Sequence, residues 1–134
     1  MEMSHMYEST ILALGSMALL MLVQLVFADV VGIRSKHEPG STVRADHKNL
    51  LFRSTRTVAN TNESVAIFVL ATLFCIFSNA SPSYTAYASW GFVAARLIYA
   101  VFYYSNLQLW RSIAFGIAVL CLLALIVIGF SVWV

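Results

Sequence analysis

The sequence predicts an all-α fold, an integral membrane four-helix bundle. Of its 134 residues, 60% are hydrophobic and only 10% are charged, and the mean hydropathy of +0.82 lies outside the range of soluble globular proteins. Four apolar segments use up nearly the whole chain, and a helix of such a length crosses a hydrocarbon core of about 30 Å. We therefore expect one transmembrane domain, residues 1–134, with spans at about 8–33, 47–79, 84–105 and 110–134.

The first and last spans are the clearest. Residues 11–31 are apolar except for Gln24 and Asp29, and residues 113–134 contain no ionisable side chain. No small-residue cleavage site follows the first apolar run, so we expect this span to stay in the protein rather than to be removed as a signal peptide. Pro39 and Gly40 should end any continuation of its helix.

The two middle spans carry ionisable residues. No Pro or Gly interrupts the chain from Asp46 to Asn79, which predicts a helix of about 34 residues, longer than the membrane is thick. Its basic first half should therefore lie among the lipid headgroups or in the cytoplasm. Arg96 interrupts the third apolar run, residues 86–104.

The distribution of basic residues predicts the topology. Six of the eight Lys and Arg residues lie between the apolar runs 11–31 and 64–78, Arg111 lies between the apolar runs 86–104 and 113–134, and the connection 79–84 has no charge. By the positive-inside rule, the first and third connections are cytoplasmic and both termini are outside. The Trp and Tyr residues near the predicted span ends also fit aromatic belts at the two interfaces.

Two sets of polar side chains recur at helical spacing beside or within these apolar runs. The first set has intervals of three, four and three: Arg53, Arg56, Asn60 and Glu63. The second has intervals of three and four: Arg96, Tyr99 and Tyr103. At about 100° per residue, each set shares one face of its helix. Ionisable groups at membrane depth are costly and usually face a bundle interior or a wet cavity, so we predict one polar site between helices.

The residue types in these two stripes indicate a ligand with carboxylates and an amine. Arg guanidinium groups bind carboxylates in a bidentate fork, Glu63 can pair with an ammonium, and Asn60 can both donate and accept. A glutathione-like peptide fits this set. Its thiol has a pKa of roughly 8.5 by analogy with Cys, and a nearby Arg favours the reactive thiolate. A hydroxyl of Tyr99, Tyr103 or Ser112 could stabilise the sulfur anion further.

Simpler roles exist for several of these residues. Basic side chains in an inner loop are expected in any membrane protein, so Arg34, Lys36, Arg44 and Lys48 also fit topology determinants. Arg53 could extend its charge to lipid headgroups. Glu63 and Arg96 are harder to explain in this way, because they lie next to or within spans, and either a functional role or a mutual ion pair would account for them.

Two linked motifs resemble those of the membrane-associated proteins in eicosanoid and glutathione metabolism, the MAPEG family. The first runs from Arg56 through Asn60 to Glu63. The second is Ala95, Arg96, Tyr99 and Tyr103, followed after a short loop by Arg111 and Ser112. The match in order and spacing extends from about Arg34 to Phe115, and the flanking apolar helices agree in length.

The resemblance implies a homotrimer of four-helix subunits with a glutathione site at each subunit interface, open to the cytoplasm. Carried over by position, the glutathione contacts are Arg56, Asn60, Glu63, Arg96, Tyr99 and Tyr103, with Arg34 as a further candidate; Arg53 is a candidate contact from its place in the first polar stripe. In the leukotriene-forming and prostaglandin E-forming members, an Arg that matches Arg111 lies near the thiol and is assigned a role in activating it. Ser112 matches a serine proposed to assist in the prostaglandin enzyme.

This chain departs from the family pattern at Thr57, Val58 and Ala59, where many members carry His, Gln or a further Arg. The departure leaves two functions open. One is a glutathione-dependent transferase, with peroxidase activity as a variant, that takes lipophilic electrophiles from the bilayer. The other is a non-catalytic lipid-binding or scaffold protein on the same fold, because the family includes one member that presents arachidonate to a lipoxygenase.

Other classes of protein fit poorly. A small multidrug transporter would need an acidic residue in mid-membrane, whereas Glu8, Asp29 and Glu63 lie near span ends. The three His residues are far apart in sequence and no Cys pair accompanies them, so no metal site is predicted. The chain has no phosphate-binding glycine loop, and its basic residues flank spans, so we expect no nucleic-acid partner.

Overall fold

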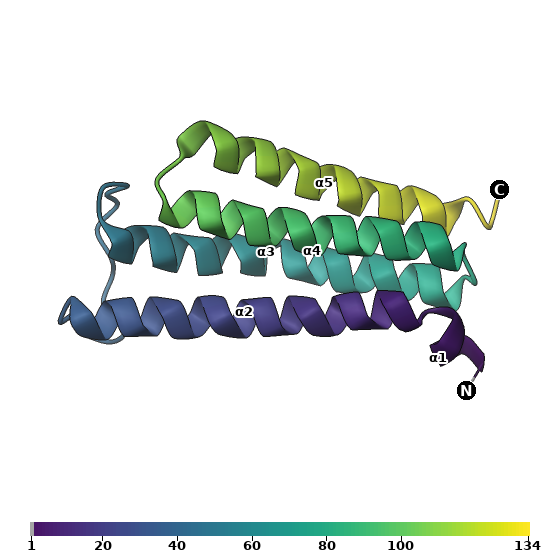
Figure 1. The fold of residues 1–134 in the computed structure, drawn as a ribbon, viewed down its shortest axis with the longest axis horizontal. Helices are drawn as coiled ribbons and strands as arrows, with labels where there is room; N and C mark the ends of the chain where they lie inside the picture. Colours follow the sequence, from purple (N-terminus) through teal and green to yellow (C-terminus); the bar gives the residue numbers. More distant parts are fainter. Residues whose placement is uncertain (1) are drawn as a thin grey trace.

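The computed structural model describes residues 2–134, and the regular elements in this part of the chain are all helices, without strands. A short helix, α1 (Glu2–Met6), precedes four long ones (Figure 1). These are α2 (Glu8–Arg34), α3 (Leu50–Phe77), α4 (Pro82–Tyr104) and α5 (Gln108–Phe130). The all-helical class predicted from the sequence is confirmed.

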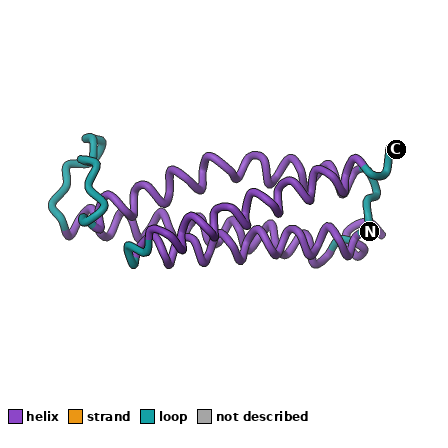
Figure 2. The backbone as a smooth tube through the Cα atoms, turned by 90° about the horizontal axis from the view of Figure 1, so that it is seen from above, coloured by secondary structure: helices purple, strands orange, loops and turns teal. Residues whose placement is uncertain are grey.

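The long helices lie side by side, and each runs antiparallel to the next in sequence (Figures 1 and 2). Both termini lie at one end of the bundle, which we call the terminal end. The long basic loop, residues 35–49, and the short connection 105–107 lie at the opposite end, which we call the loop end. Charges that are far apart in sequence therefore meet at one end of the molecule.

Helix α3 has 28 residues and is therefore shorter than the run of about 34 residues expected from the sequence. It begins only at Leu50, since Asn49 has an extended backbone (φ −88°, ψ 124°) and its side chain accepts a hydrogen bond from the Leu51 amide. This is a standard N-cap, which satisfies one of the free amides of the first turn. Just before it, the Asp46 carboxylate accepts from the Lys48 amide at 3.0 Å, which holds the chain in a turn.

Three long helices end in the same way. Lys36, Asn79 and Asn106 adopt left-handed backbone conformations (φ 53°, 53° and 58°) just after α2, α3 and α4. In each case the next amide donates back into the last helical turn at 2.9–3.0 Å, which satisfies a free carbonyl. The end of α2 is therefore set by this turn, several residues before Pro39 and Gly40.

By length and composition, α2, α3 and α5 are apolar enough to cross a membrane. The 23-residue α4 is not in this group, because its Ser, Thr and Tyr residues lower its hydropathy. It nevertheless lies along the other three helices and packs most extensively against α5. The fourth span, through α4, stays a prediction.

The core runs along the middle of the bundle and consists largely of small residues and a few aromatic rings. Ala13, Ala71 and Ala118 let the helices approach closely, which is the usual basis of helix packing in membranes. Between α3 and α4, the rings of Phe68 and Phe92 stack with centroids 4.5 Å apart. This packed layer separates the polar side chains of the loop end from the terminal end.

Candidate functional site

A polar pocket of about 240 Å³ lies near the loop end, between α3, α4 and α5. Its lining residues are Arg56, Asn60, Tyr99, Tyr103, Arg111, Ser112 and Phe115. Members of both polar stripes thus line one pocket within a single chain. Six of the ten residues predicted for the site are on its surface.

The local structure explains how these side chains converge. Arg56 and Asn60 are one helical turn apart on α3, and Tyr99 and Tyr103 are one turn apart on α4, so each pair presents a single face. The left-handed Asn106 turns the chain back so that α5 starts at Gln108. This tight connection brings the first turns of α5 against the last turns of α4.

An acidic group and two donors meet at the edge of the pocket. Arg56 Nη1 lies 3.1 Å from Glu63 Oε1, and Asn60 Nδ2 lies 3.4 Å from Glu63 Oε2. The ion-paired side chains are 43% and 58% exposed, so the pair adds little to stability and is accessible to a ligand. Among the described residues Glu63 pairs with Arg56, and not with Arg96, which the sequence had left open.

Two guanidinium groups flank a pair of tyrosine rings. Arg111 Cζ lies 4.3 Å from the Tyr103 ring centroid, and Arg96 Cζ lies 4.4 Å from that of Tyr99. The two rings are themselves 5.4 Å apart. The two distances from Arg to ring centroid are within the range of favourable cation–π contacts, so the rings hold the two Arg side chains in defined places.

His47, from the basic loop, reaches the same site. Its Nδ1 lies 3.2 Å from Arg111 Nη1. Because a guanidinium can only donate, this hydrogen bond needs Nδ1 as the acceptor and, in a neutral ring, the proton on Nε2. The ring also packs edge-on against Phe52, with centroids 5.0 Å apart. No helical spacing points to His47 in the sequence, because it lies in a loop.

The remaining predicted residues lie outside the pocket surface. Arg53 donates to the carbonyls of His47 and Tyr104, at 2.7 and 3.2 Å, and so ties the loop to the end of α4. Arg96 is fully buried behind Tyr99, where its Nη2 donates to Thr61 Oγ1 at 2.9 Å. Arg34 is exposed in the last turn of α2 and does not line the pocket. Direct glutathione contacts by these three residues stay predictions.

An apolar groove of about 350 Å³ adjoins the pocket between α3 and α5. Asn60 and Phe115 line both, and Glu63 is at the rim of the groove. The rest of its surface is Ser64, Ile67, Val119, Leu122, Leu123 and Ile126. A lipophilic molecule in this groove would end beside the polar pocket. Phe115 was not among the residues predicted for the site, because in the sequence it looks like any other residue of an apolar span.

The described residues contain no group of three His, Cys, Asp or Glu side chains close enough to hold a metal ion. Arg, Asn, Tyr and Ser side chains dominate the pocket, and these suit an organic anion rather than a cation.

Fold and site together define a helical membrane protein with a polar pocket beside an apolar groove. The MAPEG family model matches residues 10–131, nearly the whole chain. The protein belongs to the MAPEG family, as its two motifs predicted, and is a multi-pass integral membrane protein. Searches among curated proteins and solved structures gave no match.

Proposed function

We propose that this protein is a glutathione-dependent membrane transferase that conjugates glutathione to lipophilic electrophiles. The observation that carries the proposal is the junction of two surfaces. The pocket with Arg56 and Arg111 shares Asn60 and Phe115 with the apolar groove. Such a junction holds a polar thiol and an apolar electrophile next to each other, and proximity of this kind lowers the barrier of a bimolecular reaction.

In this proposal the exposed cluster of Arg56, Asn60 and Glu63 binds glutathione. Arg56 and Asn60 take a glutathione carboxylate, and Glu63 exchanges part of its contact with Arg56 for the ligand ammonium. The pocket of one chain, about 240 Å³, is below the usual range of about 300–1,000 Å³ for small-molecule sites. We propose that a neighbouring subunit of a homotrimer completes it, as the family resemblance implies.

Arg111 and Ser112 would act on the thiol. The positive charge of Arg111, held by Tyr103 and His47, favours loss of the thiol proton. The Ser112 hydroxyl, which donates to the Gln108 carbonyl at 3.0 Å, would turn from that carbonyl to donate to the sulfur anion. The thiolate attacks the electrophilic carbon, a C–S bond forms, and the leaving group departs with the bonding electron pair. With a lipid hydroperoxide, the same thiolate would attack the terminal peroxide oxygen, the O–O bond would break and the lipid alcohol would leave, and a second glutathione would convert the resulting sulfenic acid to glutathione disulfide and water.

The proposed orientation follows the charges. The basic loop and Arg111 lie at the loop end, and both termini lie at the other. We propose that the loop end is cytoplasmic, so that the site draws on cytoplasmic glutathione while the groove collects its partner from the bilayer. Protease protection of epitope tags at each end of the chain in sealed vesicles would test this orientation.

The experiment that tests the function compares Arg111→Ala with wild type. In detergent-solubilised protein, we expect Arg111→Ala to bind glutathione but to lose about 100-fold in the turnover of chlorodinitrobenzene, because removal of a preorganised charge-stabilising donor typically costs that much. Arg44→Ala, which removes an exposed loop charge, is the matched control and should behave like wild type. Unchanged turnover in Arg111→Ala would rule out the proposed role.

The apolar groove also favours the second function, a non-catalytic lipid-binding or scaffold protein. The two functions differ in one simple measurement. The transferase binds glutathione at equilibrium, whereas the lipid-binding protein binds a fatty acid in the groove and shows no heat of binding with glutathione. Calorimetric titration of wild-type protein with each ligand separates them.

A further inference from the structure

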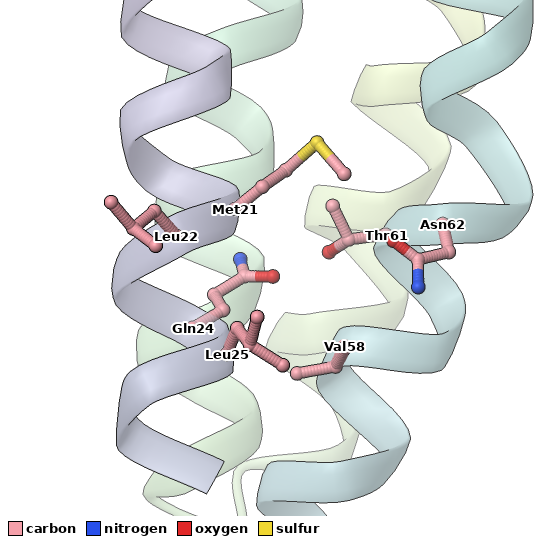
Figure 3. A pocket seen from close by; sticks show the side chains of 7 residues that line it. All are labelled: Met21, Leu22, Gln24, Leu25, Val58, Thr61 and Asn62. Carbon is pink, nitrogen blue, oxygen red and sulfur yellow. The ribbon is translucent and has the colours of Figure 1, made fainter. Parts of the chain in front are cut away.

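A second cavity, of about 160 Å³, lies between α2 and α3 on the side of the bundle away from the polar pocket (Figure 3). Its lining residues are Met21, Leu22, Gln24, Leu25, Val58, Thr61 and Asn62. In Figure 3 the Gln24 amide and the Thr61 hydroxyl point toward each other across the gap, with Met21 on one side and Leu25 and Val58 on the other. This places two polar groups in otherwise apolar surroundings.

The polar atoms around this cavity lack enough partners. Gln24 is 2% exposed, and neither its Nε2 nor its Oε1 has a hydrogen-bond partner among the described residues. Thr61 is 1% exposed and accepts from Arg96 Nη2, which leaves its own hydroxyl proton free to donate. The fully buried Arg96 has Nε and Nη1 without partners as well. Each such group costs free energy at membrane depth.

The chemistry of the lining indicates what satisfies these groups. An amide needs both an acceptor and a donor, and water supplies both. No ionised side chain lines the cavity, so it offers no charge to an ion. Since a water molecule occupies about 30 Å³, the cavity has room for several. It opens to the bundle surface beside the exposed Leu22 and Leu25, but the Gln24 and Thr61 side chains in its wall are buried and supply the contacts that hold water.

We propose that water in this cavity joins Gln24 to Thr61, and that Thr61 in turn positions the guanidinium of Arg96 under the thiol-binding pocket. Arg96 then holds Tyr99, whose ring forms part of the pocket wall. Thr61 directly follows Asn60 on α3, so the two side chains point to different faces, one to the pocket and one to Arg96. Gln24 and Thr61 are positioning residues, and their effect on glutathione rests on the proposed function.

The first test uses glutathione affinity and the ionisation of the bound thiol, read from thiolate absorbance against pH. We expect Thr61→Val to weaken glutathione binding about tenfold, because it removes the oxygen that accepts from Arg96 Nη2. Gln24→Leu should weaken binding about threefold, because it removes the amide that holds the water bound to Thr61. Both should raise the pKa of the bound thiol. Thr61→Ser keeps the hydroxyl and should behave like wild type, whereas a purely steric role of Thr61 predicts the reverse order, because Val keeps the shape of Thr and Ser lacks its methyl group.

The matched control is Thr72→Val. Thr72 lies on the same helix, is fully buried and has an Oγ1 without a partner, but it lies three turns away from the cavity. It should leave glutathione binding and thiol ionisation unchanged. Equal effects of Thr72→Val and Thr61→Val would overturn the proposal, and so would a Gln24→Leu variant that binds glutathione like wild type.

The second test needs no glutathione and separates the relay from the proposed function. In thermal unfolding of the ligand-free protein, a water link makes Gln24→Leu and Thr61→Val non-additive, with the double variant no less stable than Thr61→Val alone. If the cavity is dry, Gln24→Leu should instead raise the thermal stability, because replacing an unsatisfied amide by an apolar side chain stabilises the protein. Additive effects, or a higher Tm of Gln24→Leu, would overturn the relay even if glutathione binds.

Discussion

The two ends of the bundle use aromatic side chains in opposite ways. At the terminal end, the Tyr7 hydroxyl donates to the Ala80 carbonyl, and Trp90 Nε1 donates to Ser9 Oγ at 3.1 Å. Trp133 Nε1 likewise donates to Ser78 Oγ at 3.0 Å. These bonds are neutral and tie together segments that are far apart in sequence. The aromatic side chains at this end therefore have a structural role.

At the loop end the tyrosines present ring faces instead. Tyr99 and Tyr103 are 5% exposed and support Arg96 and Arg111, while the Arg56–Glu63 pair stays open to solvent. Tyr103, which its spacing placed in the polar stripe, is buried in the wall of the pocket, although an inner aromatic belt was the simpler alternative for a tyrosine at this level. A charged end opposite a neutral end is the pattern expected when one of them binds a ligand.

The largest expected difference between the two ends concerns the exposed Arg56–Glu63 ion pair at the loop end. We expect Glu63→Gln to weaken glutathione binding at least tenfold, because the ligand ammonium loses its counter-charge, with little change in thermal stability. Calorimetric titration and thermal unfolding measure the two quantities. The control is Glu8→Gln, an acid in the first turn of α2 at the terminal end. If both variants bind glutathione equally well, the Glu63 cluster is not the binding site.

A smaller effect should follow from the junction of pocket and groove. We expect Phe115→Ala to raise the KM for a long-chain electrophile about fivefold, because it removes apolar surface shared by pocket and groove. The KM for a small, polar electrophile should stay unchanged. Phe77→Ala, at the exposed end of α3, is the control. Equal changes for both electrophiles would mean that the groove is not the entry route.

His47 should matter less than Arg111, which it supports. We expect His47→Phe to lower kcat about threefold, because it keeps an aromatic ring but removes the acceptor for Arg111 Nη1. His37, half-buried in the same loop, does not line the polar pocket, so His37→Phe is the control. Steady-state kinetics of the two variants side by side would decide this, and a drop in both would point to the loop as a whole.

The terminal end should affect stability alone. We expect Tyr7→Phe to lower the free energy of unfolding by about 1 kcal/mol, because the Ala80 carbonyl loses its buried donor. Glutathione affinity and turnover should match wild type. A loss of turnover without a loss of stability would mean that the two ends are coupled and would remove the distinction drawn between them.

Spacing alone revealed most of the candidate site. The intervals within α3 and α4 placed Arg56, Asn60, Tyr99 and Tyr103 on helix faces, and the motif resemblance added Arg111 and Ser112. Residues without a periodic signal were missed or undervalued. His47 lies in a loop, Phe115 is one of many apolar residues in its span, and Thr61 became significant only when its contact with Arg96 was known.

The sequence by itself determined that this is a helical membrane protein of the MAPEG family, because hydropathy and motif spacing are local properties of the chain. The tertiary structure decided which charges meet. It paired Glu63 with Arg56 rather than Arg96, buried Arg96 behind Tyr99, and brought His47 to Arg111. Such pairings depend on how the helices are rotated about their axes and on the path of the loop. The sequence alone does not show which of two Arg residues pairs with an acid when both are candidates.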